Sequence, residues 1–253
     1  MVYQGAPGLT WRAAYADWVR PPSVGSLAPV DVAGVPLESR FVEAGGRLKQ
    51  TALHVQWSPD ERNFFHARVM ELRLRNPGTL GVDLRTPSLP LLEELRNAQL
   101  VNLSAVDLLE ADPGALDGRV RSLGLGAARL LGSRGSVYAK YFYHQFSGNY
   151  IDENRQTVGV AWMPWLPRHI LALGGTWASP ARLYFSGRLV YRSLRYEDAA
   201  GLTPHPAGWK LDLVGFWESA DKRLTIGAGA LNLLGPQSAR EFRRYVIDLK
   251  LKF

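Results

Sequence analysis

The chain has 253 residues, of which 46% are hydrophobic and 21% charged, so it can bury a sizeable core and wholesale disorder is excluded. It carries 30 Lys and Arg residues against 23 Asp and Glu residues, a formal net charge of +7, and its lack of cysteine excludes disulfides, thiolate metal sites and cysteine nucleophiles. No apolar run approaches the roughly 18 residues that a membrane-spanning helix needs. The first eight residues lack the basic and apolar regions of a secretory signal, so we expect that the chain stays where it is made or is a piece of a longer one.

Ten segments have the side-chain period of two that is typical of β-strands, or the composition of strands. The pattern is clearest in the last segment, where apolar residues at odd positions alternate with mostly charged residues at even positions. In chain order, the predicted strands are 9–18, 50–57, 64–75, 119–131, 137–144, 169–177, 183–192, 209–218, 223–230 and 244–253. Composition and position alone support 9–18, 119–131 and 169–177, so their faces stay unassigned.

Two segments depart from this regularity. Segment 64–75 changes phase near Met70 and Glu71, which predicts a β-bulge. Segment 157–162 could be an eleventh strand, but an odd number would break the parity of a closed antiparallel sheet. We therefore place it in the loop before the strand that starts at His169.

Short and long connections alternate along the chain. The short polar turns are 58–63, 132–135, 178–181 and 218–222, and the long links are 19–47, 76–118, 147–168, 193–208 and 233–242. This asymmetry is typical of outer-membrane barrels, which have tight turns on the periplasmic side and long loops outside. We predict an all-β fold, an antiparallel transmembrane β-barrel domain over residues 1–253 with about ten strands, long extracellular loops and short periplasmic turns.

The alternative is a soluble β-sandwich, whose strands also alternate but whose apolar rows point inward. Aromatic residues at the ends of the apolar rows favour the membrane barrel, because Trp and Tyr prefer the two membrane–water interfaces. The residues predicted to lie at these interfaces are Trp57, Trp177, Tyr191, Trp209 and Trp217.

Basic residues dominate the row that faces away from lipid under this hypothesis. The predicted lumen-facing set is Arg121, Lys140, Arg188, Arg192, Lys210, Lys250 and Lys252, and only Asp212, Glu218 and Asp248 clearly offset it. A lumen of this kind favours anions, because its low-dielectric wall focuses the field of the fixed charges. There is no basic run with interleaved aromatic residues, so no nucleic-acid partner is expected.

Enzymatic chemistry is not expected. The five histidines are scattered, without a metal-binding motif, so neither a metal site nor a cofactor is predicted. His144 with Ser147, or Asp152 with Glu153, could be the remnant of a barrel hydrolase, but such residues are equally ordinary in a polar loop.

Two further segments have a structural interpretation. The stretch Gly124-Leu125-Gly126 lacks the rest of a dinucleotide fingerprint and indicates thin strand packing. Segment 89–101 has leucines near helical spacing, which predicts a short amphipathic helix over or inside the barrel mouth, or one packed within its own loop.

Several fragments, in their order and spacing, resemble the end of a TonB-dependent receptor barrel, or of the related barrels attached to tetratricopeptide-repeat proteins of Gram-negative bacteria. They are 166–177, 188–193, 221–227, 231–235 and the last strand, with a weaker likeness at 18–21 and 45–48. The resemblance implies that Tyr245, Leu249, Leu251 and Phe253 form the signal read by the outer-membrane assembly machinery. The sequence departs from the family in three respects: it lacks an energy-coupling box, it lacks a plug, and it has about half the strands. We therefore expect it to form the last strands of a larger barrel or to be a shortened relative.

Three functions follow as hypotheses. The first is a transporter-like or porin-like barrel in the cell outer membrane that passes or recognises small anionic solutes. The second is a barrel that anchors a surface assembly or export component with a periplasmic repeat domain, and the third is a barrel hydrolase. The expected partners are the lipid bilayer, lipopolysaccharide and the assembly machinery, with a TonB-type or periplasmic partner reached through further N-terminal regions.

Overall fold

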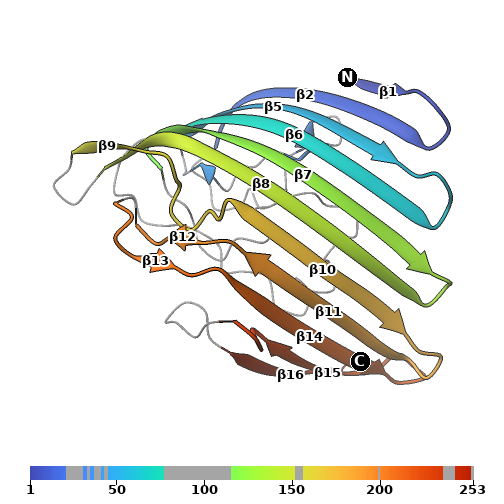
Figure 1. The fold of residues 1–253 in the computed structure, drawn as a ribbon. Helices are drawn as coiled ribbons and strands as arrows, with labels where there is room; N and C mark the ends of the chain where they lie inside the picture. Colours follow the sequence, from blue (N-terminus) through green and yellow to red (C-terminus); the bar gives the residue numbers. More distant parts are fainter. Residues whose placement is uncertain are drawn as a thin grey trace.

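The computed structural model describes residues 1–20, 31–32, 35–36, 41–42, 45–76, 115–151, 156–198, 200–235 and 243–251. Most of them belong to one antiparallel sheet of 12 strands, accompanied by two small two-stranded sheets (Figure 1). The strands are β1 (Val2–Gln4), β2 (Leu9–Val19), β3 (Asp31–Val32), β4 (Val35–Pro36), β5 (Arg47–Trp57), β6 (Asn63–Arg75), β7 (Asp117–Leu131), β8 (Gly135–Ile151), β9 (Thr157–Val160), β10 (His169–Ala178), β11 (Leu183–Arg192), β12 (Arg195–Tyr196), β13 (Pro204–His205), β14 (Gly208–Glu218), β15 (Leu224–Leu231) and β16 (Arg244–Leu251). The described residues include no helix that is long and apolar enough to cross a membrane.

Each strand of the large sheet pairs with the next one along the chain. The order is β1-β2-β5-β6-β7-β8-β10-β11-β14-β15-β16, and β9 pairs only with the far end of β8. In the described ranges, ten strands have eight residues or more, and they are the ten predicted. Residues 157–160 form a strand, which contradicts their placement in a loop, although β9 pairs only with β8 and lies outside the path. The predicted all-β, antiparallel barrel fold is confirmed.

The connections divide between the two edges of the sheet, as predicted. Tight turns join β1 to β2, β5 to β6, β7 to β8, β10 to β11 and β14 to β15, all at one edge, on the right in Figure 1. The long links leave from the opposite edge. We call these two ends of the strands the turn edge and the loop edge, as distinct from the outermost strands of the sheet, β1 and β16.

Two of the tight turns have the same construction. In each, a serine carbonyl accepts a hydrogen bond from the N–H three residues later, Ser179 from Arg182 at 3.0 Å and Ser219 from Lys222 at 3.1 Å. Arg182 and Lys222 then have positive φ angles of 61° and 58°, a left-handed conformation that costs a residue with a Cβ atom free energy. In the second turn, a hydrogen bond from the Ser219 hydroxyl lowers the pKa of Asp221.

We expect Lys222→Gly to stabilise the protein, because glycine adopts this φ without steric cost. The expected gain is about 0.5–1 kcal/mol in the free energy of unfolding, measured by urea titration in lipid vesicles. Lys222→Ala is the control, since it removes the same charge but keeps the Cβ atom, and it should give no gain. Equal effects of the two substitutions would show that charge, and not φ, matters at this position.

The two faces of the sheet differ in burial, and we name them accordingly. The inner face carries the residues whose side chains are covered, such as His54, Met70, Phe142 and Val190, and the outer face carries the residues between them. Large apolar side chains such as Val69 are exposed on the outer face, Val69 by 57%. The sheet curves from β2 round to β16 (Figure 1).

The predicted bulge in β6 is wrong. Pairing with β5 continues without interruption from Arg47 opposite Arg75 to Trp57 opposite Phe65, and pairing with β7 is equally regular. The change of phase is chemical instead. The outer face of β6 changes from apolar to charged at Glu71, while its inner face changes from polar to apolar at Met70.

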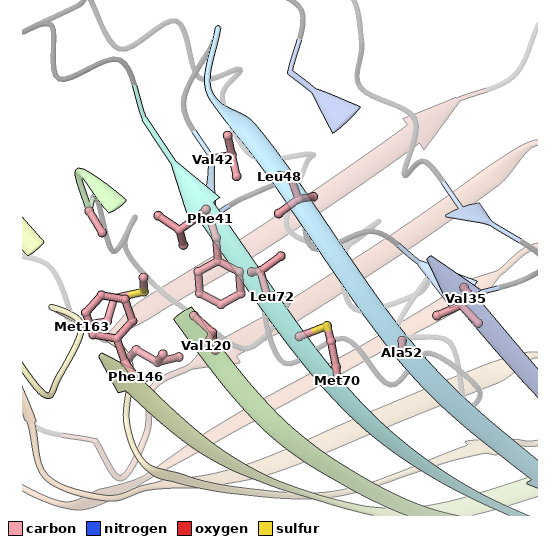
Figure 2. Close-up of a cluster of buried hydrophobic side chains, with 14 of the residues drawn as sticks. Val35, Phe41, Val42, Leu48, Ala52, Met70, Leu72, Val120, Phe146 and Met163 are labelled. Atoms are coloured by element: carbon pink, nitrogen blue, oxygen red, sulfur yellow. The ribbon is translucent and has the colours of Figure 1, made fainter. Parts of the chain in front are cut away.

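The same inversion crosses the neighbouring strands and explains where the largest core lies. Near the loop edge, the inner faces of β5 to β8 carry a buried apolar cluster that includes Leu48, Leu72, Val120 and Phe146, and other chain segments cover it with Phe41, Val42 and Met163 (Figure 2). Beyond this level toward the turn edge, the inner face becomes polar and the outer face apolar. A strand that leaves a hydrocarbon layer must make this exchange, because the core moves from outside the sheet to inside it.

The sheet has two open edges within the described residues. β1 and β16 are its first and last strands, and they do not pair with each other. Unpaired backbone donors and acceptors are not tolerated in hydrocarbon, so in a membrane both edge strands must be paired, either with each other or with further strands.

Candidate functional site

The strongest concentration of polar side chains is on the inner face between the apolar cluster and the turn edge. The pairing places Arg12, His54 and Arg68 in one row across β2, β5 and β6. The next inner row toward the turn edge holds His66, Lys140 and Lys210. The row after that holds Tyr138, Arg188 and Asp212, so we call these nine residues the inner polar surface.

Asp212 is the buried acid of this surface. Its side chain is 1% exposed and accepts a hydrogen bond at 2.8 Å from the Arg188 guanidinium, which is itself 23% exposed. Its other carboxylate oxygen accepts the backbone N–H of Asn232 at 2.9 Å. The pair neutralises Arg188, while the remaining charged members of the inner polar surface are all cationic. Among these nine residues, cations therefore outnumber acids.

Glycines make room for the large polar side chains. A Cβ atom at Gly126 would lie 1.9 Å from Nε2 of His66, and one at Gly174 would lie 2.4 Å from Cζ of Tyr138. The rings therefore lie flat over the neighbouring strand, His66 toward Lys140 and Tyr138 toward Arg188. The prediction that Gly124-Leu125-Gly126 serves thin packing is confirmed at Gly126.

Three buried histidines stand among these cations. His54 and His66 lie 6.4 Å apart between ring centroids, and His144 stacks on Phe142 at 6.2 Å. The ring nitrogens of His54 and His144 have no hydrogen-bond partner among the described residues. In that same part of the chain, no group of three or more His, Asp or Glu residues could hold a metal ion.

The structure contradicts the first pair considered for a barrel hydrolase, His144 with Ser147. His144 is buried on the inner face of β8, whereas Ser147 is exposed on the outer face. Residues three apart in a strand point to opposite sides, so the imidazole cannot reach the hydroxyl. Asp152 and Glu153 lie outside the described residues.

The predicted lumen-facing residues divide into three groups. Lys140, Arg188, Arg192 and Lys210 are on the inner face, and Lys250 pairs with Thr225 on the same face of the last strand. Arg121 was placed on the wrong face, since it alternates with the buried Val120 and Ser122 and its side chain is 58% exposed. Lys252 lies outside the described residues, as do Phe253 and segment 89–101.

Two cations of the surface were missed. Arg12 lies in a predicted strand whose faces composition left unassigned, and Arg68 lies in the segment whose chemical inversion resembled a bulge. Had the period of two been extended straight through Met70, it would have placed Arg68 beside the inward His66.

The five predicted interface aromatics all lie on the outer face. Trp57 stacks on Phe65 at 5.3 Å and Trp177 on Phe185 at 5.9 Å near the turn edge, and Tyr191 contacts Trp209 at 5.2 Å near the loop edge. Trp217 is at the turn-edge end of β14, opposite Leu183. Their place at a membrane interface stays a prediction, as does the assembly signal, of which Tyr245, Leu249 and Leu251 are exposed on the outer face of β16.

Comparison with known proteins agrees with this architecture. No family model matches the chain, and no curated protein matches it significantly. Among solved structures, the siderophore receptor PiuA from Acinetobacter baumannii matches all of the chain at 14% identity with a TM-score of 0.57. The ferric-catecholate import receptor Fiu from Escherichia coli K12 matches it at 13% identity with 0.54, and the copper transporter OprC at 12% with 0.55.

The fold is that of an outer-membrane β-barrel. The chain spans about a third of each of these proteins, 35% of PiuA, 34% of Fiu and 38% of OprC. At this identity the likeness concerns the fold alone. It supports the resemblance to TonB-dependent receptors in architecture.

Proposed function

We propose that the chain forms the C-terminal strands of a larger outer-membrane barrel that passes or recognises small anionic solutes at the cell surface. The observation that carries this proposal is the inner polar surface, where five cations (Arg12, Arg68, Lys140, Arg188 and Lys210) stand with the acid Asp212, while Glu218 and Asp248 lie on the same inner face nearer the turn edge. The open edges of the sheet and the partial coverage of the similar receptors support the larger barrel.

The proposed location follows from the outer face. Its apolar residues between the two aromatic levels suit contact with acyl chains, and the structures with this fold include an outer-membrane pyoverdine receptor. In this orientation the loop edge faces the cell exterior and the turn edge the periplasm. A TonB-type partner would act on parts of the full protein other than these strands.

The type of solute follows from electrostatics. Fixed cations along a wall that borders hydrocarbon attract anions more strongly than the same cations would in bulk water. The receptors similar to this chain carry ferric siderophores or copper by name, and a negatively charged metal chelate is the cargo class that fits a cationic inner wall.

The test is the ion selectivity of the protein purified from its native outer membrane and inserted in planar bilayers. We expect anion selectivity, and we expect the reversal potential in a salt gradient to change sign in Lys140→Glu/Lys210→Glu. These lysines are in one inner row, so both charges act on the same pathway.

The matched control is Lys49→Glu/Arg73→Glu, which changes the net charge equally but on the outer face. It should leave the reversal potential where it was. Cation selectivity of the unmodified protein, an equal shift in the control, or no conductance at all would contradict passage of anions.

A further inference from the structure

Two buried histidines on the inner polar surface have ring nitrogens that form no hydrogen bond. His54 on β5 is 5% exposed and His66 on β6 is 6% exposed. Both ring nitrogens of His54, and Nε2 of His66, are buried without a hydrogen-bond partner among the described residues. The two ring centroids lie 6.4 Å apart. A buried polar group without a partner costs free energy, so this pair of imidazoles is suited to a ligand that completes its hydrogen bonds.

The charged groups around these rings are cations. Arg12 and Arg68 flank His54 in one row of directly paired residues, and Lys140 lies two strands from His66 in the next row. Arg68 is 3% exposed, whereas Arg12 and Lys140 are only partly buried. Along their described lengths, the inner faces of β2, β5, β6, β7 and β8 carry no Asp or Glu residue. The ligand that fits is therefore an anion, and not a metal ion, which the three cations would repel.

An imidazole gives such a site an acceptor that lysine and arginine do not have. Lys and Arg side chains only donate hydrogen bonds, whereas a neutral imidazole has one nitrogen that donates and one that accepts. The other side-chain acceptor beside His66 is Gln56, whose Oε1 atom already accepts a hydrogen bond from Arg12. A fully deprotonated anion needs donors alone. Acceptor nitrogens placed among cations suit an anion that still carries a proton.

Inorganic phosphate is a small anion with this property. At neutral pH it keeps at least one P–OH group, whereas sulfate and carboxylates keep none and most phosphomonoesters have lost theirs. Hydrogencarbonate also carries a proton, but it brings a single negative charge to three cations. The remaining phosphate oxygens suit guanidinium groups, which bind phosphate through forked donors. They point in several directions, which matches donors that come from β2, β5, β6 and β8.

We propose that His54, His66 and Arg68 form a binding site for inorganic phosphate on the inner face, with Arg12 and Lys140 at its rim. The P–OH group donates to the acceptor nitrogen of one imidazole. The other oxygens accept hydrogen bonds from the N–H group of the second imidazole and from the Arg68 guanidinium. The inference rests on the proposed passage or recognition of anions along this face, and it names the anion that the face prefers.

The test measures binding of radiolabelled inorganic phosphate to the full protein in mild detergent, by equilibrium dialysis. We expect saturable binding at one site per chain. We also expect sulfate, hydrogencarbonate and glycerol 3-phosphate to compete at least tenfold less well than unlabelled phosphate. Absence of saturable binding, or competition by any of the three as strong as that by phosphate, would overturn the proposal. This measurement uses the unmodified protein, so it does not depend on whether a variant folds.

Paired substitutions test the role of the two rings. We expect His54→Phe/His66→Phe to weaken phosphate binding at least tenfold, because it keeps two flat rings but removes their donors and acceptors. His54→Gln/His66→Gln keeps a donor and an acceptor at each position, so it should retain the preference for phosphate over sulfate. Equal behaviour of the two variants would show that the nitrogens do not matter and would overturn the proposal.

The matched control is His144→Phe. It removes an equally buried imidazole in the row of Met70, where the inner face becomes apolar, and it should bind phosphate within about twofold of the unmodified protein. A loss in this control as large as in the paired Phe variant would overturn the assignment to His54 and His66. Ion selectivity in planar bilayers tests the proposed passage separately, since binding in detergent needs no conductance. Binding without anion selectivity would contradict the passage alone, and anion selectivity without binding would contradict the site alone.

Discussion

Leu213→Arg is expected to prevent stable insertion of the barrel. Leu213 is 44% exposed on the outer face, midway between Trp209 and Trp217 along β14. If acyl chains contact this face, an arginine at the middle of the bilayer costs about 2–4 kcal/mol. We expect the folded fraction, measured by heat-modifiable migration, to fall severalfold, and the urea midpoint in lipid vesicles to fall with it.

The control for this substitution is Thr51→Arg. Thr51 is exposed on the same face, but it is paired with Glu71 at the level where the outer face becomes charged. We expect a change within about 1 kcal/mol there, because the cost of an outward arginine falls toward zero near the interface. If Leu213→Arg were as harmless as Thr51→Arg, the outer face would meet water and the soluble sandwich would be the better description.

The sequence predicted the architecture well because period-two patterns and connection lengths are local features. Seven of the ten long strands and the division of turns and loops between two edges follow from them, and composition and position indicated the other three, β2, β7 and β10. The change of phase at Met70 and Glu71 was visible in the sequence, but its cause, an exchange of faces and not a bulge, could not be read locally. In the proposed membrane barrel, that exchange follows from the height of a residue relative to the bilayer, which depends on how the neighbouring strands are staggered and not on the segment itself.

The same cause explains the error at Arg121. A basic residue in a strand with weak contrast was assigned inward because charge avoids lipid, yet Arg121 is on the outer face above the apolar band, where it contacts Glu71 at 3.1 Å. The inner polar surface was predicted in part, since alternation placed Lys140, Arg188 and Lys210. Asp212 was predicted as an inward acid, but Arg12 and Arg68 were missed, and the contact of Asp212 with Arg188 depends on pairing between strands, which a single sequence does not show.

Asp212→Leu is the second substitution with a large expected effect. It leaves the Arg188 guanidinium without its partner at 2.8 Å and the backbone N–H of Asn232 without its acceptor at 2.9 Å. Removing one member of a buried pair is costly because the remaining charge stays desolvated, so we expect a loss of about 3 kcal/mol in the free energy of unfolding. Asn232 has a φ of 54° where β15 ends, so the loss should also loosen the start of the loop that follows.

The control is Asp17→Leu, which breaks an ion pair of similar length, 2.7 Å to Arg47, at an exposed position. There we expect no more than about 1 kcal/mol, because water solvates the guanidinium that remains. Arg188→Leu/Asp212→Leu should recover part of the loss by removing the orphaned charge, though not the part due to Asn232. If Asp212→Leu cost no more than Asp17→Leu, water would reach Asp212 in the folded protein. The inner polar surface would then border an aqueous pore wide enough to solvate its own ion pairs, and its field on a passing solute would be correspondingly weaker.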